Sequence, residues 1–134
     1  MLKHCWLAAL LSVFAFSGCD SGPRMHAVSG KVTLDGQPVP DGEIVFLDPD
    51  NKIGPDAGKI ADGQFAFKAK AGKKKVEIRA ARMEKPPPGA AGGPGGGEAV
   101  AIDYIPERYN DKSELTADVG SGSSNRFDFE LTSK

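Results

Sequence analysis

Cysteine is scarce in this sequence, with two in 134 residues, and one of them lies within the first five. Such a chain is not a disulfide-stabilised scaffold, and it has too few thiolates for a zinc site. An excess of charge of one sign is also lacking, because 17 basic side chains stand against 18 acidic ones. Binding to nucleic acid depends on a basic surface, so this balance argues against a nucleic-acid partner.

Long apolar runs and helical periodicity are missing as well. The longest apolar run covers residues 5–16, whereas a membrane-spanning helix needs about 20 residues. Nothing after that run has the spacing of an amphipathic helix. Glycine and proline are plentiful instead, with 17 and 10 residues, which favours short strands joined by turns. The length fits a single domain.

The N-terminal segment has the features of a secretory signal, because a short basic stretch containing Lys3 precedes the apolar run. The residues that follow, 16–19, resemble the lipobox of bacterial lipoproteins, in which small residues precede a cysteine that accepts a diacylglyceryl group on its thiol. We therefore expect residues 1–18 to be a lipoprotein signal peptide, Cys19 to be lipidated, and residues 19–26 to form a tether. Ordinary secretion with an incidental cysteine is the alternative.

A lipidated Cys19 would hold the protein at a membrane. Each buried methylene of an acyl chain contributes about 0.8 kcal/mol, so two or three chains anchor firmly. We expect a cell-envelope protein that faces the periplasm or the exterior, with the membrane as its first partner.

Period-2 alternation of apolar and polar residues predicts strands in five segments, which are residues 28–34, 65–69, 76–80, 115–119 and 127–131. Residues 44–47 are apolar throughout, as expected of a strand covered on both faces. A short strand at 57–60 connects to the next through Asp62-Gly63, a pair that favours a tight hairpin. The pattern predicts an all-β sandwich or small barrel over residues 27–134, in which the Pro/Gly-rich residues 86–97 form a loop.

Several motifs resemble those of carboxypeptidase regulatory-like, transthyretin-like domains. They are Gly30-Lys31-Val32-Thr33-Leu34-Asp35-Gly36-Gln37-Pro38-Val39, Gly42-Glu43-Ile44-Val45-Phe46 and the segments at 61–65 and 72–78. Segments 105–110, 113–117 and 127–131 look like those of small planctomycete-type envelope lipoproteins that carry this domain. The resemblance implies a seven-stranded transthyretin-like or immunoglobulin-like antiparallel β-sandwich without an active site or a cofactor of its own.

Metal binding finds little support in the residues. Once the signal peptide is removed, His26 and Cys19 are the only nitrogen or sulfur ligands of the usual kind, and zinc needs about four ligands. Residues 48–56 superficially resemble a calcium loop, but Lys52 and Ile53 stand where an oxygen ligand and a glycine are required. We interpret their Asp and Asn residues as turn formers and expect no metal site.

Catalysis is not expected either. A Ser-His-Asp arrangement would need His26, which we place in the tether. The transthyretin-like hydroxyisourate hydrolases depend on histidines and on a Tyr-Arg-Gly-Ser ending, and this chain ends Leu131-Thr132-Ser133-Lys134. A hydrolase of that type is therefore the least favoured alternative.

Two polar segments have both a functional and a structural interpretation. Residues 103–111 hold both tyrosines, and Tyr104, Arg108 and Tyr109 are candidates for binding carbohydrate or peptide. Alternatively, Tyr109 packs under a corner and its hydroxyl ties the loop to the backbone, as in the tyrosine corners of sandwiches. The lysines at 73–75 either contact anionic lipid or polysaccharide, or form a solvated strand edge.

The sequence thus predicts a non-catalytic, lipid-anchored envelope module for binding or scaffolding. Its partner would be an envelope protein or a polysaccharide, and no sequence feature indicates an oligomeric state. A carbohydrate-binding module that uses residues 104–109 is the main alternative.

Overall fold

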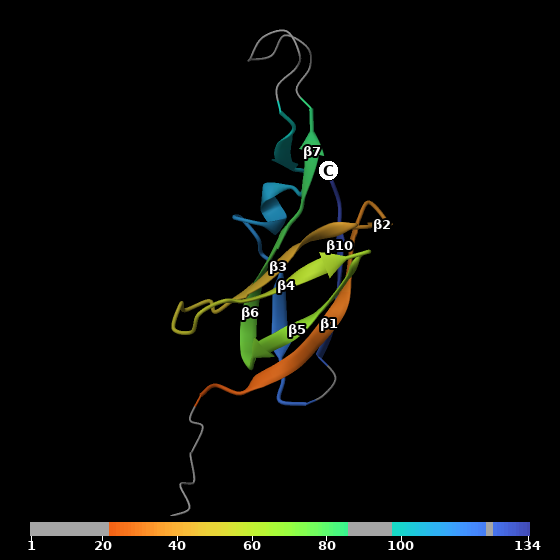
Figure 1. Cartoon of the computed structure of the whole chain (residues 1–134). Helices are drawn as coiled ribbons and strands as arrows, with labels where there is room; N and C mark the ends of the chain where they lie inside the picture. Colours follow the sequence, from red (N-terminus) through yellow and green to blue (C-terminus); the bar gives the residue numbers. More distant parts are fainter. Residues whose placement is uncertain (1–21, 86–97, 123–124) are drawn as a thin grey trace, which may run out of the picture.

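The computed structural model describes residues 22–85, 98–122 and 125–134, and strands make up nearly all of the regular structure there (Figure 1). The only helical element in these ranges is the three-residue 3-10 turn η1 (Glu107–Tyr109). The strands are β1 (Met25–Leu34), β2 (Gln37–Pro38), β3 (Asp41–Leu47), β4 (Asp56–Ala61), β5 (Gln64–Lys70), β6 (Gly72–Arg79), β7 (Ala81–Glu84), β8 (Val100–Asp103), β9 (Thr116–Val119) and β10 (Asn125–Leu131). The all-β prediction is confirmed.

Seven strands form one continuous sheet in the order β10-β1-β5-β4-β3-β6-β9, and β2 pairs with β1. The remaining two strands, β7 and β8, form a separate ribbon. Neighbouring strands are antiparallel, except that β10 runs parallel to β1 over the full length of β10.

The sheet curls so strongly that its two halves pack against each other. Phe46 of β3 lies with its ring centroid 5.0 Å from that of Phe67 on β5 and 5.9 Å from that of Phe127 on β10, although β3 is not a neighbour of either strand. The core takes the alternate inward residues of both halves, which explains the period-2 pattern. Among the described residues, the buried apolar positions of this core run from Val28 to Leu131.

Lys74 is the most deeply buried charged residue among those that the structure describes. It is 1 % exposed and has the same inward phase in β6 as Val76. The alternative of a strand edge at residues 73–75 holds only in part, because β6 pairs with β9 over residues 72–75 but with β3 only from Lys75 to Arg79, which leaves Lys73 and Lys74 with a paired strand on one side. Since Lys73 and Lys75 have the opposite phase, the three lysines do not form one basic patch.

Two Asp-Gly pairs form tight turns between paired strands, and the hairpin predicted at Asp62-Gly63 is confirmed. Asp62 and Gly63 have φ of 51° and 73°, the two positive values that a type I′ turn requires, and they join β4 to β5. Asp35 and Gly36, with φ of 50° and 80°, turn the chain from β1 into β2 in the same way. The strand β2 was not predicted, since two residues are too few to show alternation.

The N-terminal boundary differs from the expected one. His26 was placed in the tether, but it belongs to β1 and pairs with Ala69 of β5. The predicted signal peptide, Cys19 and the Pro/Gly-rich residues 86–97 lie outside the described residues. Within the described ranges, no helix has the length and apolar character to cross a membrane.

The ribbon of β7 and β8 was also not predicted. It projects from the sandwich at the end opposite the start of β1 (Figure 1). The ribbon and the N-terminal connection therefore occupy opposite ends of the domain.

Candidate functional site

The loop that carries both tyrosines is fixed by internal contacts. Ile105 is buried at its centre, and its N–H donates to Asp103 Oδ1 at 3.0 Å. The buried Asn110 closes the turn, because its Nδ2 donates to the carbonyl of Ile105 at 3.3 Å. This rigid turn separates Tyr104, before it, from Arg108 and Tyr109 in η1. The three predicted site residues consequently line two different hollows.

Arg108 and Tyr109 bind the last residues of the chain. The N–H of Thr132 donates to the Tyr109 hydroxyl at 3.2 Å, and the Thr132 hydroxyl lies 3.3 Å from the same oxygen. Arg108 donates through Nη2 to the carbonyls of Thr132 and Lys134, and its guanidinium carbon lies 4.9 Å from the centroid of the Tyr109 ring. The Tyr109 hydroxyl thus ties its loop to the backbone, as the corner interpretation expects.

These contacts shift the titration of two groups. The pKa of Tyr109 is lowered to about 8, first because the Thr132 hydroxyl hydrogen-bonds to the phenolic oxygen, then because Arg108 and the Thr132 N–H act on it. The pKa of Asp35 is also lowered, because Ser133 hydrogen-bonds to this carboxylate. Both shifts favour the charged form of a group that holds the C-terminal residues in place.

Tyr104 lies in a different environment, a hollow at the junction of β1, β2 and the ribbon, which we call the Tyr104 hollow. It is lined by Leu34, Gln37, Pro38, Val39, Pro40, Arg82 and Tyr104. Tyr104 is half-buried, and the guanidinium carbon of Arg82 lies 5.7 Å from the centroid of its ring. Burial raises the pKa of Tyr104, and the carboxylates of Asp41 and Asp103 add to this effect. Its hydroxyl therefore stays protonated at neutral pH and can donate a hydrogen bond.

The Tyr104 hollow has the composition of a small ligand site. Its lining is mostly apolar, with prolines and one aromatic ring, and it has three polar side chains, those of Arg82, Gln37 and Tyr104. Its volume of about 290 Å³ suits one ring or side chain of a larger ligand. Of these residues, the sequence alone indicated only Tyr104 as a candidate for ligand binding.

The position of the Tyr104 hollow relative to the N-terminus follows from β1. This strand has ten residues, from Met25 beside the N-terminal connection to Leu34 at the hollow, which corresponds to about 30 Å. A ligand at Tyr104 would be bound at the end of the domain remote from the predicted tether.

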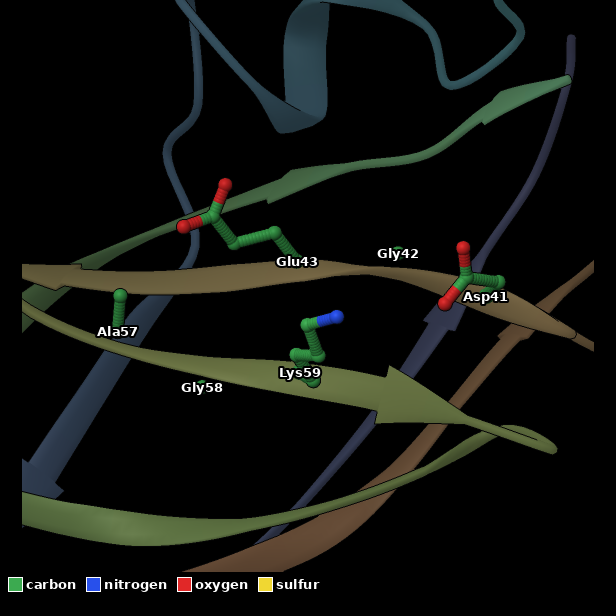
Figure 2. A pocket seen from close by; sticks show the side chains of 6 residues that line it. All are labelled: Asp41, Gly42, Glu43, Ala57, Gly58 and Lys59. Atoms are coloured by element: carbon green, nitrogen blue, oxygen red, sulfur yellow. The ribbon is translucent and has the colours of Figure 1, made fainter.

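A second hollow lies on the outer face of β3 and β4 (Figure 2). Asp41 and Glu43 from β3 and Lys59 from β4 surround it, while Ala57 and two glycines leave its floor without large side chains. It offers no aromatic ring, and its charged groups are solvent-exposed. This composition supports ligand binding less well than that of the Tyr104 hollow.

The acidic residues of segment 48–56 have structural partners. Asp48 Oδ2 accepts the N–H groups of Lys52 and Ile53 at 2.8 and 3.3 Å, which supports the turn interpretation. Asp56 is buried and its Oδ1 lies 2.6 Å from Lys70 Nζ. Across the described ranges, no group of three or more His, Cys, Asp or Glu side chains could hold a metal ion.

The two tyrosines should titrate separately. In a protein that starts at residue 22, Tyr104 and Tyr109 are the only tyrosines and tryptophan is absent. We expect the ultraviolet absorbance of phenolate to rise in two steps, one near pH 8 from Tyr109 and one above the usual tyrosine pKa of about 10 from Tyr104.

Substitution assigns the steps. Tyr109→Phe should remove the lower step and Tyr104→Phe the upper one. Because the folded state lowers the pKa of Tyr109, the free energy of unfolding should rise between about pH 8 and 10 relative to Tyr109→Phe, and this gain should vanish below pH 8. A single step above pH 10 would contradict the described contacts of Tyr109.

Comparisons of this chain with protein-family models, with curated proteins and with solved structures found no significant match. The resemblance to carboxypeptidase regulatory-like domains and to envelope lipoproteins therefore stays a prediction from the sequence motifs.

Proposed function

We propose that this chain is a non-catalytic binding module, anchored in the bacterial cell envelope by a lipid on Cys19, and that the Tyr104 hollow binds its ligand. The observation that supports this most strongly is the placement of the hollow. It lies at the end of β1 remote from the N-terminal connection, so a lipid at Cys19 would present it away from the membrane surface.

The absence of catalysis is proposed from the placement of the reactive residue types. The single histidine among the described residues, His26, is near the start of β1, about 25 Å of strand from Leu34 at the hollow. The buried carboxylate Asp56 is paired with Lys70. His26 is therefore beyond the hydrogen-bond reach that a general base on a ligand at Tyr104 would need. The carboxylates that act on Tyr104, those of Asp41 and Asp103, are solvent-exposed, and Asp103 accepts the N–H of Ile105.

A polysaccharide unit fits the chemistry of the Tyr104 hollow better than a free small molecule. An aromatic ring and prolines offer apolar surface to the face of a sugar, while Arg82 and Gln37 offer hydrogen bonds to its hydroxyl groups. The predicted role of Arg108 and Tyr109 in such binding is less favoured, because their polar groups hold Thr132. A protein segment is the second candidate, since the same ring and prolines would accept an apolar side chain.

A binding measurement tests the proposal. The protein from residue 22 onward, which includes all of the described core residues, is applied to an array of envelope polysaccharides. We expect a positive glycan to lose affinity at least tenfold, or about 1.4 kcal/mol, in Tyr104→Ala. The matched control is Tyr109→Phe, which removes a hydroxyl on the other side of the fixed turn and should keep the affinity.

Circular dichroism would establish that both variants fold. Unchanged affinity in Tyr104→Ala would contradict the assignment of the hollow. A complete lack of glycan binding by the wild type would contradict the polysaccharide and leave the protein segment as the candidate ligand.

A further inference from the structure

The outer edge of β7 has no strand beside it in the described part of the chain, since β7 pairs only with β8. A two-stranded ribbon is marginally stable by itself, and a third strand or a packed face normally supports it. Met83, in the middle of β7, is 67 % exposed and is the most exposed large apolar residue in the described ranges. The edge therefore combines free backbone groups with an uncovered apolar side chain.

The hydrogen-bond phase of the ribbon shows which backbone groups are free. The N–H of Tyr104 donates to the carbonyl of Ala80 at 3.0 Å, which makes these two residues a hydrogen-bonded pair. Pairs alternate along an antiparallel ladder, so Arg82 and Glu84 bond to β8 whereas Ala81 and Met83 point their N–H and C=O groups outward. Lys85 continues this outward phase.

The side chains of β7 are complementary to a second β7 that runs in the opposite direction. Arg82 and Glu84 flank Met83 and form an ion pair on one face of the ribbon. When two copies of β7 are paired antiparallel about Met83, each Arg82 stands opposite Glu84 of the second copy. The two Met83 residues stand opposite each other, and Ala81 stands opposite Lys85.

We propose that β7 pairs antiparallel with β7 of a second copy of this chain, which joins the two ribbons into one four-stranded sheet. In this register Met83 forms a hydrogen-bonded pair with its counterpart, because its backbone groups point outward. Arg82 and Glu84 of opposite copies become non-hydrogen-bonded partners, the arrangement in which side chains lie closest.

Charge also selects this register over its neighbours. A shift by two residues in either direction keeps the hydrogen-bond phase, but it brings Arg82 opposite Arg82 or Glu84 opposite Glu84. Like charges directly opposite each other destabilise a strand pair. A shift by one residue would place the outward-pointing backbone groups of one β7 opposite groups of the other β7 that already bond to β8. It would also bring side chains from opposite faces of the two ribbons together.

A disulfide tests this pairing independently of the ligand proposed for the Tyr104 hollow. The protein from residue 22 onward has no cysteine, because both cysteines precede that residue. In the proposed dimer the Cα atoms of the two Met83 residues lie about 5.5 Å apart, which is within the range for a disulfide. We expect Met83→Cys to form a disulfide-linked dimer under mild oxidation.

Ala81→Cys is the matched control, because it introduces an exposed cysteine in the same strand and on the same face. Its counterpart would lie about 14 Å away, four residues along the strand, which is too far for a disulfide. We expect it to crosslink at least tenfold more slowly. Equal rates for the two variants, or a Met83→Cys protein that stays monomeric, would overturn the proposal and leave a different protein as the partner of this edge.

Charge reversal adds a second readout in the Met83→Cys background. Arg82→Glu and Glu84→Arg should each slow crosslinking at least tenfold when alone, because each places like charges opposite each other. A mixture of the two variants should crosslink fast again, since both acidic side chains of one copy then stand opposite arginines of the other. A mixture as slow as its components would contradict the proposed register.

Discussion

Gly30→Ala should lower the free energy of unfolding of this domain more than a Gly→Ala substitution at the other described glycines. Gly30 lies in β1 opposite Phe127 of β10, and a Cβ atom there would be 1.7 Å from the carbonyl oxygen of Phe127 and 2.9 Å from the Phe65 ring. The oxygen belongs to the backbone of the adjacent strand, so it cannot move aside without breaking the β1–β10 ladder.

We expect a loss of more than about 3 kcal/mol, because ordinary overpacking costs about 1–3 kcal/mol and here the obstacle is backbone. A domain of this size has a total stability of about 5–15 kcal/mol. Urea unfolding of the protein from residue 22 onward would measure the loss. The same variant should also expose Phe127 and Phe129 to solvent if β10 detaches.

Gly54→Ala is the matched control for this prediction. A Cβ on Gly54 would meet no atom within 4 Å, and its φ is not positive, so the change should stay within about 0.5 kcal/mol. Equal stabilities of the two variants would contradict the close approach of β1 and β10.

The parts of the fold that could be predicted from the sequence are those in which burial imposes a pattern. Strands β1, β5, β6, β9 and β10 alternate because one face of each contacts the core, and Asp62-Gly63 specifies its hairpin by backbone geometry. The ribbon of β7 and β8 lies outside the core and leaves Met83, Val100 and Ile102 exposed. Without a buried face it has no alternation of burial to detect.

The site was only partly predictable for a different reason. Tyr104 and Tyr109 are close in sequence, but the turn at Ile105 directs them into separate hollows. Pro38 and Arg82 meet Tyr104 because β2 and the start of β7 lie at the same corner, which depends on the tertiary arrangement of the strands and not on local sequence. The burial of Lys74 also could not be predicted from local sequence. A run of lysines indicates an exposed segment, but the alternation of β6 points the middle lysine inward.

Cys19→Ala should move the protein from the membrane fraction to the soluble fraction. The apolar run at 5–16 is shorter than the roughly 20 residues that span a bilayer, so the proposed acyl chains supply the attachment. Each of their methylenes contributes about 0.8 kcal/mol, and removing the thiol that accepts the lipid removes this whole contribution. Fractionation of cells that produce each variant would measure the change.

Cys5→Ala is the matched control, since it changes the other cysteine of the chain and should leave the protein in the membrane fraction. Membrane retention of Cys19→Ala equal to that of the wild type would argue for attachment by other means.

Mass spectrometry of the N-terminal peptide, taken from protein extracted from the membrane, examines the proposed anchor without any substitution. We predict a peptide that begins at Cys19 and carries a diacylglyceryl group on the thiol. A peptide that begins at another residue, or one with an unmodified Cys19, would contradict the proposal that a lipid on Cys19 anchors this module at the membrane.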